Sequence, residues 1–485
     1  MIRLDERLGA IAEMVTGCIG EGEARAADIG CDHGYLTAYL LEACPRLTMQ
    51  ASDVSAPSLE KARKLMAQRG LTDRVTLTVA DGLDALDGRM DAVVIAGMGA
   101  QTIVQIVRAG REKLRGAKLI VQANVDLPLL RTELAHLGFT VERECYTQAG
   151  GRQYVTMQAC EAEAKALAPR EALLGTAVSG VKDDAQRAYY SWQRGVRVRE
   201  LERIAGRKTN KAMERLAQCL NEMIWIGEAI GMKACTVRDI ETLVGGIAPF
   251  ELAEEWDNVG LLVGWPEKTA DRVLVALDVT PAVIDEAKSL GAQLILTHHP
   301  VMFSARKRMT SADHEGRMLL DMAQAGISLI AAHTNLDAAP GGVNDTLMTL
   351  MGAKNVRGEG FIRVGDLPEG TTLGSLRTRA QQKLGGVVRA YGGAETPVHV
   401  LGCCSGAGSG EIAAAKALGA DCFITGEVKH DRALTAMDMG VCLLEAGHYE
   451  TENPVCEVLA SALQNAADAL KYRVTVFCSK VHPFE

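Results

Sequence analysis

Short apolar runs that alternate with amphipathic stretches set the strongest limit on how this chain of 485 residues folds. Several such runs follow one another between residues 25 and 160. Runs of this length, rich in Val, Ile, Leu and Ala, are typical of buried parallel strands joined by helical crossovers. The pattern predicts an α/β domain. The runs are Ala26–Ile29, Leu47–Ala51, Val75–Val79, Ala92–Ala96, Lys118–Val121 and Gln153–Met157.

The character of the chain changes twice, which predicts an α/β domain at 1–165, a helical hairpin at 166–232 and a second α/β domain at 235–485. In the middle segment the apolar runs vanish, and Gly206 is the expected break between two helices. Thr236–Asp239 is typical of a capped helix entry. Further strand-like runs follow at Val273–Asp278, Gln293–Thr297 and Ile327–Ala332.

Composition narrows the class of protein. The 13 Cys include no CxxC pair, which favours reduced thiols and a cytoplasmic location. No apolar run reaches the length of about 18 residues that a membrane span needs, and the first residues lack the order of a signal peptide. The net charge is −9, yet Arg187–Arg215 holds nine basic residues against three acidic ones. This basic stripe is either a solvated helix face or a surface for nucleic-acid phosphates.

A turn rich in Gly and Asp follows the first strand-like run and opens a helix. Asp28 lies near the end of the run Ala26–Ile29, and Gly30 and Gly34 let the backbone approach a ligand closely. Asp53 ends the next run, where a carboxylate can accept hydrogen bonds from ribose hydroxyls. Asp81 follows the third run, where an acid can meet an adenine amine. These positions predict a nucleoside-containing cofactor, although a plain α/β turn would show the same glycines.

Asp32 at the centre of the turn discriminates between cofactors. The NAD fingerprint needs a further Gly and a free helix N-terminus for its pyrophosphate. A carboxylate is unfavourable beside a pyrophosphate and favourable beside a sulfonium or an amino group. The turn therefore favours S-adenosylmethionine over NAD.

Residues 1–232 resemble the bacterial tRNA (adenine-22-N1)-methyltransferase family. The resemblance implies a Rossmann-like class I methyltransferase domain, a coiled-coil-like helical hairpin that contacts tRNA, and methylation of N1 of an adenosine. Ala100 departs from the family pattern, in which a further Gly is common. The segments that carry the resemblance are Asp28–His33, Ala96–Gly99, Asn124–Asp126, Leu130–Arg131 and the hairpin.

The chemistry assigns candidate roles within this half. N1 of adenine is a weak nucleophile, so positioning should supply most of the rate. Asn124, or the backbone around Gly97, is expected to hold the adenine edge, and Gly97 also joins the cofactor-binding set. Asp32 or His33 is expected to manage the amine proton. The rival reading is a small-molecule methyltransferase, against which the hairpin and its basic stripe argue.

Three motifs in the second half predict a cage for two divalent metal ions. His298 and His299 follow a strand and diverge, so each can serve its own ion. His448 and Glu452 lie four residues apart, which places both on one face of a helix. Asp337 or Glu452 can bridge two ions, which form a hydrolytic clamp when they lie about 3.5–4 Å apart. Zinc, iron, manganese and magnesium all remain open.

His333 stands apart from these five ligands. It lies four residues before Asp337 in a stretch that reads as a loop. We interpret it as an orienting residue behind the ligands rather than as a ligand. A satisfied core histidine is the ordinary alternative for any single His.

Residues 235–485 resemble the Nif-three-like dinuclear metal-centre family, often labelled GTP cyclohydrolase type-2-like. The resemblance implies that His298, His299, Asp337, His448 and Glu452 bind two metals, and that the chain forms homo-oligomers. No nucleotide motif supports the cyclohydrolase label, so the substrate stays open between a nucleotide and another phosphoester. Glu427 and His430 are further pocket candidates. The resemblance rests on Trp256–Leu261, Thr297–Pro300, Ala332–Asp337, Thr425–His430 and Gly447–Glu452.

The whole chain therefore reads as a bifunctional enzyme, a tRNA methyltransferase fused to a metal-dependent hydrolase-like domain. The rival for the second half is a metal-binding assembly or regulatory module without catalysis.

Overall fold

The computed structural model describes residues 2–20, 22–204, 209–358 and 360–484 and divides into two compact units. Unit 1 is Met1–Glu200 with Ala217–Gly231, and unit 2 is Leu201–Leu216 with Met232–Glu485. Both contain strands covered by helices, which confirms the predicted α/β class. The segment boundaries expected at 165 and 232 stay predictions.

Unit 1 is organised around one seven-stranded sheet with the order β3-β2-β1-β4-β5-β7-β6. The first five strands run parallel, whereas β7 is antiparallel to both of its neighbours. All six predicted strands are present. The strands are β1 (Ala24–Ile29), β2 (Leu47–Asp53), β3 (Val75–Val79), β4 (Ala92–Met98), β5 (Lys118–Ala123), β6 (Phe139–Ala149) and β7 (Arg152–Glu161).

Strand β6 is the one strand of this sheet that the apolar runs did not predict. It lies at the sheet edge and carries Glu142, Arg143 and Glu144 in succession. Because an edge strand is only partly buried, its sequence lacks the continuous apolar run of a central strand.

Helices accompany this sheet, and some of them start at side-chain caps. Asp5 accepts a hydrogen bond from the Leu8 amide, and Ser55 accepts one from the Ser58 amide, which satisfies backbone donors at two helix starts. The helices are α1 (Glu6–Cys18), α2 (Tyr35–Ala43), α3 (Ala56–Arg69), α4 (Ala100–Ala109), α5 (Leu127–His136), α6 (Pro169–Leu174), α7 (Asp184–Ile204) and α8 (Asn210–Ala229), with short 3₁₀ turns at Thr72–Arg74, Arg111–Leu114 and Gly175–Ser179.

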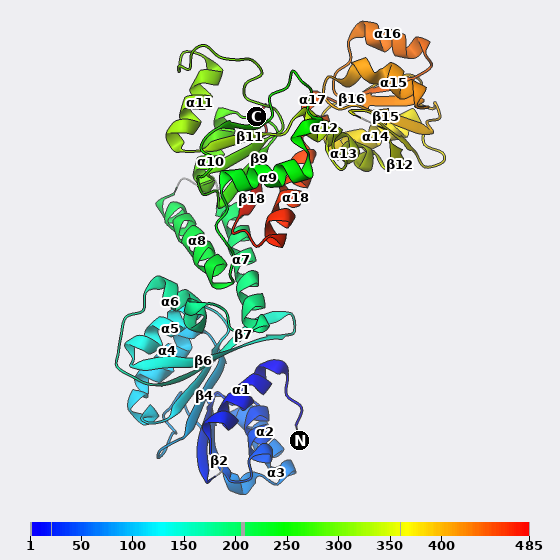
Figure 1. The fold of residues 1–485 in the computed structure, drawn as a ribbon. Coiled ribbons are helices and arrows are strands. Elements are labelled where there is room, and N and C mark those ends of the chain that lie inside the picture. Colours follow the sequence, from blue (N-terminus) through cyan, green and yellow to red (C-terminus); the bar gives the residue numbers. More distant parts are fainter. Residues whose placement is uncertain (1, 21, 205–208, 359, 485) are drawn as a thin grey trace. The chain divides into compact units, whose positions relative to one another are not determined.

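Helices α7 and α8 form the predicted helical hairpin (Figure 1). The expected break at Gly206 lies outside the described residues. The first turns of α7 are tied to the rest of unit 1, because the Tyr190 hydroxyl donates to the Leu174 carbonyl at 2.6 Å. Tyr190 is buried, so this contact holds α7 against α6 without competition from water.

A buried ion pair joins α5, β6 and α6. Arg131 Nε lies 2.7 Å from Glu144 Oε1, and the two side chains are 2% and 0% exposed. Arg131 Nη1 also donates to the carbonyls of Ala172 and Leu173 at 2.9 and 2.8 Å. Glu144 Oε2 accepts from the Thr176 amide at 2.9 Å. The pair therefore fixes the chain that leads from the sheet into the hairpin.

Unit 2 contains two sheets. The first has the order β18-β9-β10-β11-β8, with β18, β9, β10 and β11 parallel. The three strand-like runs predicted here are β9, β10 and β11. The elements of this part are α9 (Val237–Ile247), a 3₁₀ turn (Phe250–Leu252), β8 (Gly260–Val263), β9 (Arg272–Ala276), α10 (Pro281–Leu290), β10 (Leu294–Thr297), α11 (His314–Ala325), β11 (Ser328–Ala331), α12 (Thr334–Ala338), α18 (Val455–Ala469) and β18 (Thr475–Cys478).

The second sheet has the order β12-β13-β15-β16-β17-β14, and its central strands β15, β16 and β17 are parallel. Its elements are α13 (Val343–Met351), β12 (Lys354–Arg357), β13 (Arg363–Asp366), α14 (Leu373–Leu384), β14 (Arg389–Tyr391), β15 (Val400–Cys403), a 3₁₀ turn (Gly408–Glu411), α15 (Ile412–Ala417), β16 (Cys422–Thr425), α16 (His430–Asp438), β17 (Cys442–Glu445) and α17 (His448–Glu452).

Two local predictions in unit 2, a capped helix entry and a loop, have different outcomes. Thr236 and Asp239 form a capping box at the start of α9, as predicted. The stretch that contains Asp337 was expected to be a loop, and that expectation is wrong, because Asp337 lies in the short helix α12 with His333 as its N-cap.

None of the 13 cysteines forms a disulfide in the structure. Within the part of the chain that the structure describes, no helix combines the length and apolar character needed to cross a membrane.

We expect Arg131→Met to lower the free energy of unfolding of unit 1 by about 3–5 kcal/mol, because it leaves the Glu144 carboxylate buried without its cation. Calorimetry of the full chain measures this change. Arg131→Met combined with Glu144→Gln should recover part of the loss, since the charge is then gone. The exposed pair of Arg108 and Glu133 supplies the control, and Arg108→Met should cost less than about 1 kcal/mol. Equal losses from both Arg substitutions would contradict the prediction.

Candidate cofactor pocket and metal centre

The predicted cofactor turn lies at the carboxyl edge of the parallel strands of unit 1. Asp28 is in β1, and Gly30, Asp32 and Gly34 form the turn into α2 with positive φ values of 76°, 47° and 74°. Glycine adopts this backbone region freely, whereas Asp32 pays a small conformational cost there. A Cβ at Gly34 would approach the Ala62 side chain to 2.9 Å. The turn is therefore held in a shape that other residues at 30 and 34 would disturb.

A cavity of about 880 Å³ opens beside this turn. Its size is within the range of about 300–1,000 Å³ typical of ligand pockets. Asp28, Gly30, Asp32, His33, Gly97 and Asn124, six of the predicted residues, line it. The lining residues that were not predicted include Asp5, Arg7, Tyr35, Arg152, Tyr154 and Trp192. The predicted residues thus share the cavity with cationic and aromatic side chains from distant parts of unit 1.

Asn124 is oriented by a chain of hydrogen bonds. Its Nδ2 donates to the Gly97 carbonyl at 2.7 Å, and its Oδ1 accepts from Gln122 Nε2 at 3.2 Å. Gln122 is fully buried and accepts at Oε1 from Arg7 Nη1 at 3.0 Å. Because a guanidinium only donates, Arg7 determines which way both amides point. Arg7 precedes Gln122 by 115 residues, so no local pattern could reveal this relation.

Three of the predicted cofactor residues do not line the cavity. Gly34 shapes the turn from behind. Asp53 accepts from the Asp32 amide at 3.0 Å and from the Ser55 amide at 2.8 Å, so it holds the turn in place. Its oxygens keep free lone pairs for ribose hydroxyls. Asp81 is exposed in the turn after β3.

His33 has its own partner at the surface of the turn. Its Nε2 lies 3.0 Å from Lys61 Nζ, and its Nδ1 lies 3.6 Å from Asp32 Oδ2. The neighbouring ammonium means that a role for His33 in proton transfer would involve Lys61 as well.

The basic stripe on the hairpin is partly engaged. Arg197 Nε lies 2.8 Å from Glu222 Oε2, and the two side chains are only 12% and 8% exposed. Arg187 Nη1 donates to the Ile230 carbonyl. The charge of Arg197 is therefore already paired across the hairpin, and the expectation that the stripe follows tRNA phosphates stays a prediction. Arg199 is exposed.

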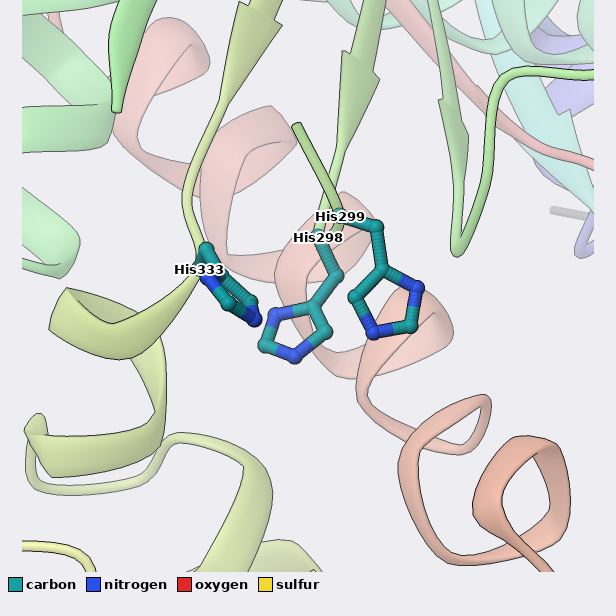
Figure 2. Close-up of side chains that lie close together, drawn as sticks. All are labelled: His298, His299 and His333. Atoms are coloured by element: carbon teal, nitrogen blue, oxygen red, sulfur yellow. The ribbon is translucent and has the colours of Figure 1, made fainter. Parts of the chain in front are cut away.

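In unit 2, the five predicted metal ligands and His333 converge between the two sheets. His298 and His299 follow β10, His333 and Asp337 follow β11, and His448 and Glu452 are the ends of α17, after β17. Figure 2 shows the side chains of His298, His299 and His333 lying close together. The ligand atoms of these three His lie within 4.8 Å of one another, as do those of His299, His448 and Glu452.

Each of the four imidazoles is held by its Nδ1 atom. The partners are the Ala332 carbonyl for His298 at 2.9 Å, Asp278 for His299 at 2.8 Å, Asp257 for His333 at 2.9 Å and Glu427 for His448 at 2.8 Å. An acceptor at Nδ1 fixes the tautomer that leaves the Nε2 lone pair available, as metal-ligating histidines require. The orienting roles of Asp257 and Asp278 were not predicted, because their His partners lie 76 and 21 residues away, although Asp257 lies in the Trp256–Leu261 motif.

Glu452 lies at the centre of the cluster. Its Oε2 is 3.0 Å from His299 Nε2, 3.2 Å from His448 Nε2 and 3.9 Å from His298 Nε2. His298 Nε2 also lies 3.6 Å from Asp337 Oδ1. His298 Nε2 and Asp337 Oδ1 are buried and have no hydrogen-bond partner. Buried polar atoms are rarely left in this state, so the cluster has the donor set and the unsatisfied atoms of a cation site.

The charges of the cluster are strongly coupled. Burial opposes ionisation of Glu452, but hydrogen bonds with His299 and His448 bring the pKa of the carboxyl well below its usual value. Burial also opposes protonation of His299, yet Asp278 and Glu452 raise the pKa of His299 to about 10. The hydrogen bond with Glu452 raises the pKa of His448 to about 9. The Glu452 carboxylate is therefore stabilised by positive charge, which protons on the histidines or a divalent cation can supply.

His298 and Asp337 respond in the opposite way. Burial lowers the pKa of His298 to about 4, so its ring stays neutral at neutral pH. Burial and the charge of Glu452 raise the pKa of Asp337 well above its usual value. A neutral imidazole is the form that binds metal, and a carboxyl that is costly to ionise alone is stabilised by a cation.

A glycine turn closes over the cluster from the second sheet. Gly406 has a φ of 57°, and a Cβ there would lie 2.1 Å from Glu452 Oε1 and 3.0 Å from His448 Nε2. Only glycine leaves room at this position. The pocket candidates Glu427 and His430 differ, because Glu427 orients His448 whereas His430 is exposed at the start of α16.

We expect Asp28→Asn to stabilise unit 1 at pH 7.5 by up to about 3 kcal/mol. Burial, opposed by the Thr37 hydrogen bond, raises the pKa of Asp28 to about 6, so the charged form above that pH weakens the folded state. The gain should shrink as the pH falls from 6 toward 4, where wild-type Asp28 becomes protonated. Calorimetry at a series of pH values measures it. Asp81→Asn, at an exposed site, is the control, and a gain independent of pH would contradict the prediction.

Two family models match the chain in succession. The Duf34/NIF3 (NGG1p interacting factor 3) model matches residues 235–484, and a methyltransferase domain model matches residues 4–157. A Clostridium acetobutylicum protein named GTP cyclohydrolase 1 type 2 homolog is 31% identical over 255 residues, which is 50% of this chain and 95% of that one.

Solved structures resemble each half. A Staphylococcus aureus hypothetical protein covers 52% of this chain and 99% of its own, with 29% identity and a TM-score of 0.50. The B. subtilis tRNA methyltransferase TrmK covers 47% of this chain and all of its own, with 23% identity and a TM-score of 0.42.

The order of the two matches agrees with the two sites described above. A methyltransferase domain implies S-adenosylmethionine as cofactor, and the His and Glu cluster suggests metal binding. The chain belongs to the Duf34/NIF3 family through residues 235–484, and it carries a methyltransferase domain ahead of them.

Proposed function

We propose that unit 1 methylates N1 of an adenosine in tRNA, at the position equivalent to adenosine 22. The observation that carries the proposal is the cavity in which the acidic turn and Asn124 meet Arg7, Arg152 and Trp192. The acidic turn favours a cationic cofactor. The cationic and aromatic side chains at the cavity favour a nucleotide that is part of a polyanionic nucleic acid. The sequence motifs shared with the tRNA (adenine-22-N1)-methyltransferase family supply the substrate.

Different residues of the cavity would bind the cofactor and orient the adenine. When bound, S-adenosylmethionine would supply a methyl group activated by its sulfonium. Asp28, Asp32 and Asp53 would hold the amino and ribose groups, with Gly30 and Gly34 shaping the turn. Since Asn124 has one amide hydrogen beyond the bond to Gly97, it can orient the adenine edge.

Proton transfer would follow the methyl transfer. Asp32 is exposed at the turn and lies next to His33, which contacts Lys61. Asp32 or His33 would accept the proton that the adenine loses once N1 carries the methyl group.

We expect Asn124→Ala to reduce the rate of tRNA methylation about a hundredfold, because the adenine is no longer held in line. Affinity for S-adenosylmethionine should stay within about threefold, since Asn124 does not shape the turn. Transfer of labelled methyl to bulk tRNA, with nucleoside mass spectrometry for 1-methyladenosine, measures the rate. Asn221→Ala, at an exposed position on α8, is the control. Methylation of small molecules but not of tRNA would instead favour the small-molecule reading.

We further propose that unit 2 binds two divalent metal ions through His298, His299, Asp337, His448 and Glu452, and acts as a hydrolase on a phosphoester or nucleotide. Support comes from the four imidazoles whose Nδ1 atoms are all occupied while their Nε2 atoms converge. His333 shares this arrangement, so we add it as a sixth ligand in place of the orienting role expected from the sequence. When bound, the ions would polarise a phosphoryl oxygen and activate water.

The protein around the ions would supply orientation. Asp257, Asp278 and Glu427 hold three of the rings, and such partners typically change metal affinity about 10–100-fold when removed. Glu452, which lies closest to three ring nitrogens, is the candidate bridge. Homo-oligomerisation through this unit stays a prediction.

We expect the purified protein to hold two divalent ions per chain and His299→Ala to hold at most one. His299 contacts Glu452, so its loss removes a ligand and disturbs the candidate bridge. Elemental mass spectrometry gives the metal content, and circular dichroism checks the fold. His314→Ala, at the exposed start of α11, is the control. Full metal content in His299→Ala would remove this residue from the ligands. A full metal site without turnover on phosphoesters and nucleotides would favour the regulatory module.

A further inference from the structure

Two exposed aromatic side chains border the metal cluster, Trp256 and Phe303. Trp256 is 61% exposed and Phe303 is 54% exposed. Both pack edge-to-face against His333, with ring centroids 6.1 and 5.6 Å apart. We call these two residues the aromatic rim. They come from separate segments, one ahead of β8 and the other in the loop after β10, so the fold brings them together at His333.

Exposure of two large rings at one place has a solvation cost that a soluble protein rarely carries without a use. The supports of the rim are rigid. The side chain of Asp257, next to Trp256, is inaccessible to solvent and accepts from both the Thr334 amide and the His333 ring. The Asn258 amide donates to the Met302 carbonyl at 2.7 Å, which ties the two rim segments to each other. These hydrogen bonds therefore fix the position of the aromatic rim beside the cluster.

We propose that the aromatic rim binds a planar heterocycle whose attached anionic group reaches the metal ions, the combination that a nucleotide offers. The inference rests on the proposed metal centre and adds the substrate class. Aromatic faces bind bases by stacking, which requires a partly open ring, whereas a buried ring serves packing. The metal ions of the cluster would bind the phosphate. The aromatic rim contacts the His333 ring, so it lies directly beside the cluster.

Adenosine monophosphate and ribose 5-phosphate form the probe pair, because they share the sugar and the phosphate and differ in the base. We expect the zinc-loaded full chain to bind adenosine monophosphate about tenfold more tightly than ribose 5-phosphate, a difference typical of one stacked base. In the Trp256→Ala/Phe303→Ala variant this ratio should fall to about one, with zinc content and affinity for ribose 5-phosphate unchanged. Isothermal titration calorimetry gives both affinities.

Trp256→Phe should keep most of the ratio, because it retains an aromatic face. Trp265→Ala is the matched control, since Trp265 is 50% exposed but contacts the Lys268 ammonium rather than the cluster. A ratio unchanged in the double variant, or no binding of adenosine monophosphate to the zinc-loaded chain, would overturn the inference. Loss of the ratio together with a change of oligomeric state in light scattering would also overturn it, because the rim would then be a subunit contact. The zinc content is measured independently of nucleotide binding, and a protein that does not take up zinc would contradict the proposed metal centre instead.

Discussion

Parallel strands end at one edge of their sheet, and both sites of this protein depend on that constraint. In unit 1, strands β1, β4 and β5 deliver the acidic turn, Gly97 and Asn124 to the same cavity. In unit 2, the paired strands β10 and β11 deliver His298 and His333 to the cluster, and β17 of the second sheet supplies His448. Backbone pairing within a sheet thus gathers residues that are distant in sequence, and the meeting of the two sheets adds the remaining ligands. The turns that follow these strands are free to carry chemistry because the strands carry the packing.

Buried charge has two different outcomes in the two units. Arg131 and Glu144 carry opposite charges and also bind backbone groups, so the pair fixes α6 and the chain beyond it, although Arg131 Nη2 has no hydrogen-bond partner. Glu452 and Asp337 are also buried, but they carry like charge and lie beside histidines, and Asp337 Oδ1 and His298 Nε2 have no hydrogen-bond partner. Because an unsatisfied buried charge is costly, such a cluster persists where a ligand repays the cost. Burial of charge alone would not have distinguished a structural pair from a site.

The predictable part of this protein is the part that is local in sequence. Apolar runs located the buried strands, and the four-residue spacing of His448 and Glu452 correctly indicated a helix. The edge strand β6 was not predicted, since partial burial leaves no apolar run. The orienting roles of the partners of the functional residues were not predicted for another reason. Arg7 reaches Gln122, and Asp257 reaches His333, across separations that only the folded chain determines. Sequence patterns therefore reveal the residues that react more readily than those that orient them.

Because Arg197 is paired with Glu222, the proposed tRNA contacts would lie closer to the cavity than to the middle of the hairpin. A guanidinium already held by a buried carboxylate would have to leave it before it could meet a phosphate, so Arg197 would contribute little to non-specific affinity. Arg152 is exposed at the cavity, and the Trp192 ring lies at the same rim on α7. The proposed role of the hairpin would then depend on the position of Trp192 as much as on the charge of the hairpin. Since α7 is anchored through Tyr190, two residues before Trp192, the same helix that continues into the basic stripe also sets the aromatic wall of the cavity.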